Sequence, residues 1–122
     1  MKKILWVSRH KMTSEQIADL ESVYGDIQTE ILDSTIEDVK KIAETDADVY
    51  AVVLPAEMIA ELQKILAPEK EIIVPVSARV KTGRTVDNKA SDTQETEYIY
   101  KHMYWKKIIS IEIRTEILRS VK

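Results

Sequence analysis

Val49-Tyr50-Ala51-Val52-Val53-Leu54 is an uninterrupted apolar run with the length of one β-strand. A strand is apolar along its whole length where both faces of its sheet are covered, as at the centre of a parallel sheet between two layers of helices. Pro55 follows at once and suits the first position of a helix, where a missing backbone N–H costs little. The run therefore predicts the central strand of an α/β fold, with a helix directly after it.

More strand-length segments and amphipathic segments surround this run. The other predicted strands are residues 3–7, 27–32 and 71–76, and the predicted helices are Ser14–Tyr24, a second that ends near Glu44, and a third between Pro55 and Pro68. The alternation βαβαβαβ requires parallel strands joined by right-handed crossovers. We expect a Rossmann-like three-layer α/β domain with a mostly parallel sheet in the strand order 2-1-3-4, and with 27–32 as an edge strand.

Capping residues and helical periodicity refine the three helices. Thr13 and Gln16 stand at capping-box spacing before the first helix, and Gly25 suits its end. Ser34 and Glu37 form a second capping box before the second helix. The predicted buried faces are Ile17, Leu20, Val23 and Tyr24; Ile36, Val39, Ile42 and Ala43; and Ile59, Leu62, Ile65 and Leu66.

The sequence pattern changes after Arg79. Residues 80–95 are polar and contain Gly83, which predicts a loop or a loose hairpin turn. The next stretch alternates with period two, with Tyr98, Tyr100, His102 and Tyr104 on one face and Ile99, Met103 and Trp105 on the other. A second alternating stretch places Ile109, Ile111 and Ile113 on one side and Ser110, Glu112 and Arg114 on the other. We therefore expect antiparallel strands within 80–117 that extend the sheet.

Length and composition limit the possible classes of protein. The 122 residues fit a single domain, with a βαβαβαβ core over 1–78 and an antiparallel β extension over 79–122. The absence of cysteine excludes disulfides and thiolate metal sites, and it fits a reducing compartment. The apolar run after Lys3 is too short for a signal peptide or a membrane span, so we expect a cytoplasmic protein with no membrane partner.

The net charge of −3 is unevenly distributed. Residues 1–78 contain fifteen Asp or Glu and eight Lys or Arg, whereas residues 79–122 contain six and ten. One interpretation is that helix surfaces favour acidic residues and strand edges favour lysine. The other is that the C-terminal part presents a basic face that meets an anionic partner.

Polar and cationic side chains follow several predicted strands at the same end. Ser8, Arg9 and His10 follow the first strand, Pro55, Ala56 and Glu57 follow the third, and Ser77 and Arg79 follow the fourth. In a 2-1-3-4 sheet the first and third strands are neighbours, and ligands bind where their carboxyl ends meet. Free N–H groups at a helix N-terminus, next to an arginine, favour an anion. We predict an anion pocket that Ser8–His10 and Pro55–Glu57 line, with Arg79 at its rim.

Each of these residues also has a simpler interpretation. Ser8 can be a turn residue, Arg9 can pair with Glu57, and His10 can be an exposed loop residue. No glycine-rich loop follows the first strand, which argues against a dinucleotide or P-loop site. Only His10 and His102 are histidines, and neither has a carboxylate pair at metal-ligand spacing, so we expect no metal and no cofactor.

Val7-Ser8-Arg9-His10 and Val53-Leu54-Pro55-Ala56-Glu57 resemble a small CRISPR-associated ring-nuclease family. Its members carry an apolar strand that ends in Thr-Arg-His and a later strand that ends in Leu-Pro before a helix, and the resemblance covers at most the first two-thirds of this chain. It implies a Rossmann-like dimer that opens a cyclic oligoadenylate without metal, through attack of a ribose 2′-hydroxyl on the adjacent phosphate. Arg9 would stabilise the phosphorane charge, His10 would be the acid or base, and Ser8 would contact a phosphate or position the hydroxyl.

A different class of function is open as well, namely a non-catalytic accessory protein that binds a protein or nucleic acid through its C-terminal sheet. Tyrosines interleaved with lysines can form a base-stacking platform, although ordinary cross-strand aromatic packing explains the same pattern and is the interpretation we favour. The rows Ile99, Met103 and Trp105 and Ile109, Ile111 and Ile113 exceed what one layer of strands needs to bury. This excess predicts a homodimer.

Overall fold

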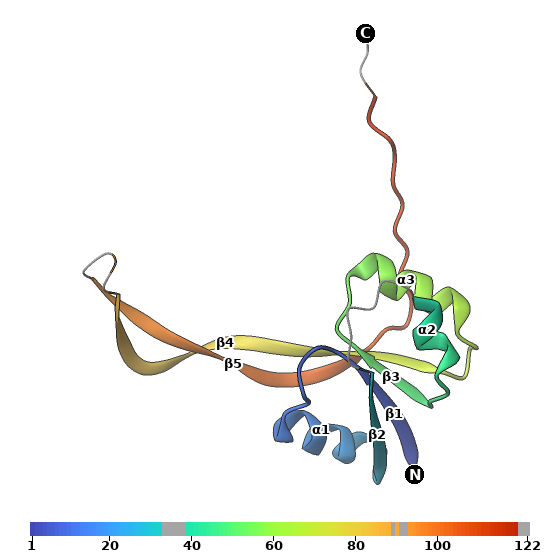
Figure 1. Cartoon of the computed structure of the whole chain (residues 1–122), viewed down its shortest axis with the longest axis horizontal. Coiled ribbons are helices and arrows are strands. Elements are labelled where there is room, and N and C mark those ends of the chain that lie inside the picture. Colours follow the sequence, from blue (N-terminus) through green and yellow to red (C-terminus); the bar gives the residue numbers. More distant parts are fainter. Residues whose placement is uncertain (33–38, 89, 91–92, 120–122) are drawn as a thin grey trace.

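The computed structural model describes residues 1–32, 39–88, 90 and 93–119. In chain order its elements are β1 (Lys2–Val7), α1 (Ser14–Tyr24), β2 (Ile27–Leu32), α2 (Val39–Glu44), β3 (Val49–Val52), α3 (Ala56–Ile65), β4 (Glu71–Asn88) and β5 (Thr93–Lys107). They form a five-stranded sheet in the order β2-β1-β3-β4-β5 (Figure 1), and neighbouring strands are parallel except for β4 and β5. The predicted α/β class, the order 2-1-3-4 and the central position of β3 are confirmed.

Side-chain alternation along the central strands divides the core into two clusters. The cluster that packs on α2 and α3 contains Leu5, Val7, Val39, Ile42, Tyr50, Val52, Ile59, Leu62 and Ile72. The cluster that packs on α1 contains Ile4, Trp6, Leu20, Val49, Ala51 and Ile73. Figure 1 shows α1 on one side of the sheet and α2 with α3 on the other. β3 is apolar throughout because helices cover both of its faces.

The predicted caps and buried faces of the helices are confirmed in part. Thr13 and Gln16 make both capping-box bonds, and Gly25 ends α1 with φ of 77°. Two predicted buried residues are wrong: Val23 is 65% exposed and Ile65 is 43% exposed. The line along α1 that meets the sheet runs through Gln16 and Leu20, and Val23 lies beside it. Pro55 is the N-cap of α3 rather than its first residue.

One predicted capping box falls outside the described residues. Ser34, Ile36 and Glu37 precede α2 there, so the structure does not test them. The two described residues of that predicted face with the largest side chains, Val39 and Ile42, are buried as expected.

The predicted antiparallel extension of the sheet is confirmed, but most of the predicted loop or loose hairpin turn over 80–95 is strand. β4 continues to Asn88, and β5 begins at Thr93, so a long antiparallel ribbon replaces the loop and extends away from the helices (Figure 1). We call its paired outer part, residues 77–88 and 93–102, the arm. Its residues are polar because solvent surrounds both faces, and a polar sequence without a buried face is easily read as a loop. Gly83, at φ of 84°, lies at a register shift between Lys81 and Thr85.

The predicted second alternating strand is also wrong. Residues 108–119 have no regular secondary structure. The chain leaves the sheet after Lys107, where the Ile108 N–H donates to the Ile72 carbonyl at 2.9 Å. The Gln63 side chain then donates to the Ile109 carbonyl at 3.1 Å and accepts from the Ile111 N–H at 3.3 Å. Bonds to a helix side chain thus replace a strand ladder.

A β-bulge changes the predicted faces of β5. Val76 pairs with Tyr104, but the next residue, Ser77, pairs with His102, so Met103 is the extra residue. The bulge brings His102 and Trp105 to the same face, although strict alternation predicts opposite faces. Their rings lie 5.6 Å apart, and both side chains bond to α1.

Pro75 lies in the interior of β4, at a place where the strand is paired on one side. β4 pairs with β3 only from Glu71 to Ile73 and with β5 beyond that point. Pro75 therefore lies at an edge of the sheet, and the strand continues past it.

Candidate functional site

The carboxyl ends of β1 and β3 lie side by side. Val7 pairs with Val52, and the Val53 N–H donates to the Val7 carbonyl at 3.2 Å. From β1 the chain turns towards β2, and from β3 it turns towards β4, so this is the point where the direction of winding reverses. The Ser8–His10 loop and the loop that leads into α3 therefore begin at neighbouring strand ends.

The Ser8–His10 loop is held by two hydrogen bonds. The His10 N–H donates to the Ser8 hydroxyl oxygen at 3.2 Å, so Ser8 does act as a turn residue. The indole N–H of Trp6 donates to the His10 carbonyl at 2.6 Å and ties the loop to the buried core. The side chains of Arg9 and His10 are exposed. A fixed backbone thus presents a cation and an imidazole to solvent.

The start of α3 has backbone N–H groups that no side chain caps, and one acidic side chain that would repel an anion. Pro55 provides no side-chain cap, and its carbonyl accepts the N–H groups of Met58 and Ile59. Glu57 lies in the first turn, where its carboxylate opposes the positive potential of the helix end. Among the described residues no ion pair joins Arg9 to Glu57. Arg9 is therefore available to an anion from solution.

A cavity of about 530 Å³ lies at the carboxyl end of β3, where β4 leaves β3, between α3 and the start of the arm. We call it the β3–β4 cavity. Its lining is mostly apolar and includes Ala56 and Ser77, together with Lys106 as its cation. Ser8, Arg9, His10 and Arg79 do not line it. The structure therefore brings Ala56 and Ser77 together, and it leaves the Ser8–His10 loop outside the cavity.

Lys106 is the residue of this cavity that the sequence reasoning missed. It pairs with Val74 in the ladder, which places it on the same face of the sheet as α3. Lys106 lies two residues before Ile108, which also lines the cavity, and residues two apart in an extended chain share a face. This spacing could have indicated Lys106 from the sequence.

Arg79 is engaged in the arm rather than at the rim of a pocket. Its guanidinium carbon lies 3.8 Å from the centre of the Tyr98 ring on the neighbouring strand. This is a cation–π contact across two strands. It supports the favoured interpretation that the tyrosines of β5 take part in cross-strand packing.

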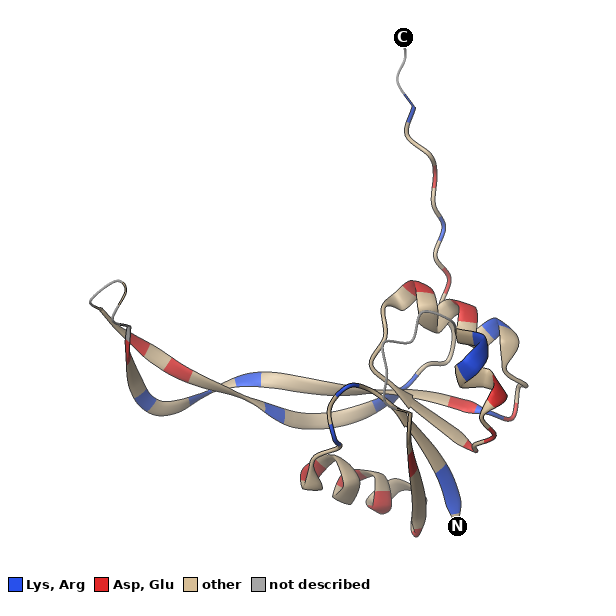
Figure 2. Cartoon of the chain, viewed as in Figure 1, with Lys and Arg blue, Asp and Glu red and all other residues tan. Residues whose placement is uncertain are grey.

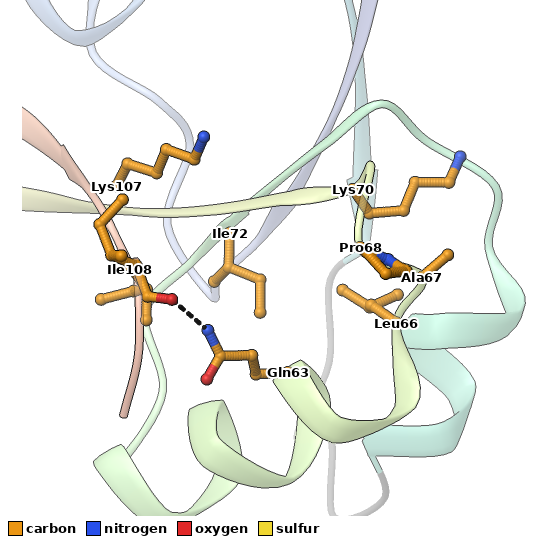
Figure 3. A pocket seen from close by; sticks show the side chains of 9 residues that line it. Gln63, Leu66, Ala67, Pro68, Lys70, Ile72, Lys107 and Ile108 are labelled. Carbon is orange, nitrogen blue, oxygen red and sulfur yellow. Dashed lines mark hydrogen bonds between the residues drawn. The ribbon is translucent and has the colours of Figure 1, made fainter. Parts of the chain in front are cut away.

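A second cavity, of about 350 Å³, lies where residues 107–109 pass the end of α3 (Figure 3). Its two lysines already have acidic partners. Lys70 bonds to Asp46 at 3.0 Å, and Lys107 lies 3.5 Å from Glu71. Because both charges are compensated, this cavity is a weaker candidate for an anion than the edge near Arg9.

The perturbed ionisable groups of the described residues lie at the opposite, amino-terminal edge of the strands. The Lys3 backbone N–H, which donates to Asp48, lowers the pKa of that carboxyl. A hydrogen bond to Asp46 raises the pKa of Lys70. Burial and a bond to Glu71 raise the pKa of Tyr24. Each of these three groups bonds to another residue of the fold.

Comparison with known proteins yields no relatives: no family model, no curated protein and no solved structure matches the chain. Within the ranges that the structure describes, no group of three or more His, Asp or Glu side chains is placed to hold a metal ion. No helix there is long and apolar enough to cross a membrane.

Proposed function

We propose that the protein binds a phosphate-bearing ligand at the carboxyl edge of the sheet, with a cyclic oligoadenylate as the first ligand to test. The observation that carries the proposal is the contact between the ends of β1 and β3, where the Val53 N–H donates to the Val7 carbonyl. Because of that contact, the Ser8–His10 loop and the segment that leads into α3 begin side by side, at the point where α/β sheets of this order bind ligands.

Charge and shape at this edge support the proposal. Arg9 has no carboxylate partner among the described residues, and the N-terminus of α3 has no side-chain cap. The adjacent β3–β4 cavity, at about 530 Å³, has the size and the apolar lining typical of small-molecule sites. A phosphate at Arg9 and a base in the cavity would use both features.

The proposal extends to cleavage without metal. The ribose 2′-oxygen attacks the adjacent phosphorus, the bond from phosphorus to the 5′-oxygen breaks, and the proton of the 2′-hydroxyl passes to the leaving oxygen through His10. Arg9 stabilises the negative charge of the phosphorane, and Ser8 donates its hydroxyl hydrogen to a phosphate oxygen. The product would be an opened chain with a cyclic 2′,3′-phosphate and a free 5′-hydroxyl.

The test is incubation of the full chain with cyclic oligoadenylates of several ring sizes, with and without a chelator, followed by chromatography. We expect one ring size to be opened at the same rate in both conditions. Equilibrium binding measured in parallel separates binding from cleavage. A protein that neither binds nor opens any of the rings would refute the proposal.

The second candidate is an accessory protein that acts through its C-terminal β-sheet. The observation that favours it is the arm, where Tyr100 is 81% exposed in the part of the ribbon that extends beyond α1. Failure of every oligoadenylate in the binding assay would favour this candidate. In either case we propose the cytoplasm as the location, because a chain without cysteine suits a reducing compartment.

A further inference from the structure

The arm extends beyond the layers that stabilise the rest of the sheet. β4 leaves β3 after Ile73, and α1 contacts β5 through His102 and Trp105 at the base of the arm. Farther out, the two strands pair with each other, and the ribbon projects away from the helices (Figure 1). A ribbon of two strands is marginally stable in water without a covering layer. A surface that covers the arm is therefore expected.

One face of the arm continues the surface on which α1 already packs. Residues opposite each other in an antiparallel pair share a face, and the pairs here are Ser77 with His102, Arg79 with Tyr100 and Lys81 with Tyr98. His102 occupies this face at the base, where its Nε2 lies 2.9 Å from Asp19 of α1. The next positions on the same face have no helix over them.

This uncovered face combines aromatic surface with positive charge. Tyr100 is 81% exposed and Tyr98 is 37% exposed. Arg79 and Lys81 lie opposite them. Two tyrosines and two cations in adjacent pairs form a surface that suits an acidic helix.

The solvent face of α1 has that character. Glu15 and Glu21 are exposed on it, whereas Val23, which is 65% exposed, lies near the C-terminal end of the helix on the side away from Glu21. Figure 2 shows acidic bands along α1 and basic bands in the middle of the arm. The same division holds over the whole sequence, because the acidic excess lies in residues 1–78 and the basic excess in 79–122.

We propose that the arm of each chain packs on the solvent face of α1 of a second copy, next to its own α1. A two-fold axis between the two α1 helices repeats the contact, so each chain gives one arm and receives one. The complementary charges of the arm and of α1 both belong to this chain, which makes a second copy the matching partner.

The length of α1 limits the area of this contact, because its eleven residues rise about 1.5 Å each and span about 16 Å. Twelve residues of β4, 77–88, span about 40 Å at about 3.3 Å per residue, and two strands about 4.8 Å apart form a ribbon about 10 Å wide. One face therefore offers about 400 Å². α1 covers about 160 Å² of that face, so two such contacts, with both partners counted, bury about 640 Å², the size of a weak interface.

The charges of the chain disfavour a nucleic acid as the occupant. The outer end of the arm is acidic, with Asp87, Glu95 and Glu97, and the core behind the arm carries a large acidic excess. A phosphate backbone that followed the basic bands would meet these carboxylates. Nucleic-acid binding is therefore an outcome that the experiment tests against the proposal.

The experiment is sedimentation of the full chain over a range of concentrations, with circular dichroism of each variant to confirm folding. We expect a dimer whose dissociation constant rises with salt, because exposed charges are screened. Lys81→Glu and Glu21→Lys should each raise that constant at least tenfold, and the double variant should restore dimerisation. Glu69→Lys, in the turn after α3, is the matched control and should leave the dimer unchanged.

Tyr100→Ser provides a second test that does not depend on charge. The side chain is exposed in the single chain, so its loss should leave the melting temperature of the monomer unchanged and weaken the dimer. A wild-type monomer at high micromolar concentration would overturn the proposal. So would a dimer that survives both Lys81→Glu and Tyr100→Ser, a double variant without rescue, or a monomer that binds RNA or DNA through the arm.

Discussion

Arg9 is exposed at the end of β1 and has no carboxylate partner among the described residues, so its removal costs the fold little. We predict that Arg9→Ala abolishes oligoadenylate binding and cleavage and changes the free energy of unfolding by less than about 0.5 kcal/mol. Calorimetric titration and urea denaturation measure the two effects. Arg114→Ala, in the exposed C-terminal segment, is the matched control and should bind normally. Equal binding by both variants would remove Arg9 from the site.

His10 contributes to the loop through its backbone and to the proposed chemistry through its side chain. The Trp6 indole bonds to its carbonyl, so His10→Ala should preserve the shape of the loop. We predict a loss of about 10²-fold in the rate of cleavage, with a flatter pH dependence near neutrality. Single-turnover rates across that pH range give both values. A variant with an unchanged pH profile would exclude His10 as the acid or base.

Asp48 links folding to acidity at the opposite edge of the sheet. The Lys3 N–H donates to its carboxylate at 2.8 Å and holds the pKa below its ordinary value of 3.8. The stabilisation is present above that value and is lost as the pH falls through the lower pKa of the folded state. Between about pH 5 and pH 2, Asp48→Asn should therefore lose stability less steeply than the wild type. Urea midpoints measured across this range test the difference, and parallel curves would contradict it.

At the scale of the element, Gln63 of α3 determines the path of the chain beyond β5. Its side chain bonds to the backbone of both Ile109 and Ile111. We predict that Gln63→Leu lowers the free energy of unfolding by about 1–3 kcal/mol, since each of the two bonds contributes about 0.5–1.5 kcal/mol. Urea denaturation measures the loss, and faster exchange of the Ile111 amide should accompany it. Gln28→Leu, on the exposed face of β2, should cost less than about 0.5 kcal/mol.

At the scale of the whole molecule, the two core clusters meet in the central strands and should unfold together. Leu5 is fully buried between β1 and the α2–α3 layer. We predict that Leu5→Ala lowers the free energy of unfolding by about 2–5 kcal/mol in one cooperative transition. Ile117→Ala, at a residue 76% exposed, should cost less than about 0.5 kcal/mol. Coincident fluorescence and circular dichroism transitions check the cooperativity, and two separated transitions would contradict it.

The residues that carry the fold could be predicted because their signals are local. The apolar run Val49–Leu54 indicated a strand covered on both faces, and the Thr13–Gln16 spacing located the start of α1. The parallel pairing followed from the alternation of elements, and the order 2-1-3-4 was expected as a common order of doubly wound sheets, which the structure confirms. The candidate site could be predicted only as far as its strand ends, because the neighbouring positions of β1 and β3 follow from that order.

The remaining features depend on contacts between distant parts of the chain. The polar residues 80–88 form a strand because β5 pairs with them. The alternating residues 109–113 form none, and the Gln63 side chain bonds to part of their backbone. The bulge at Met103 turns Trp105 towards Trp6, with ring centres 5.8 Å apart. Arg79 joins Tyr98 rather than the predicted pocket. Sequence alone determined the α/β core through local periodicity, whereas the tertiary structure decided the arm, its faces and the lining of the β3–β4 cavity, because pairing partners and register are not encoded in any one segment.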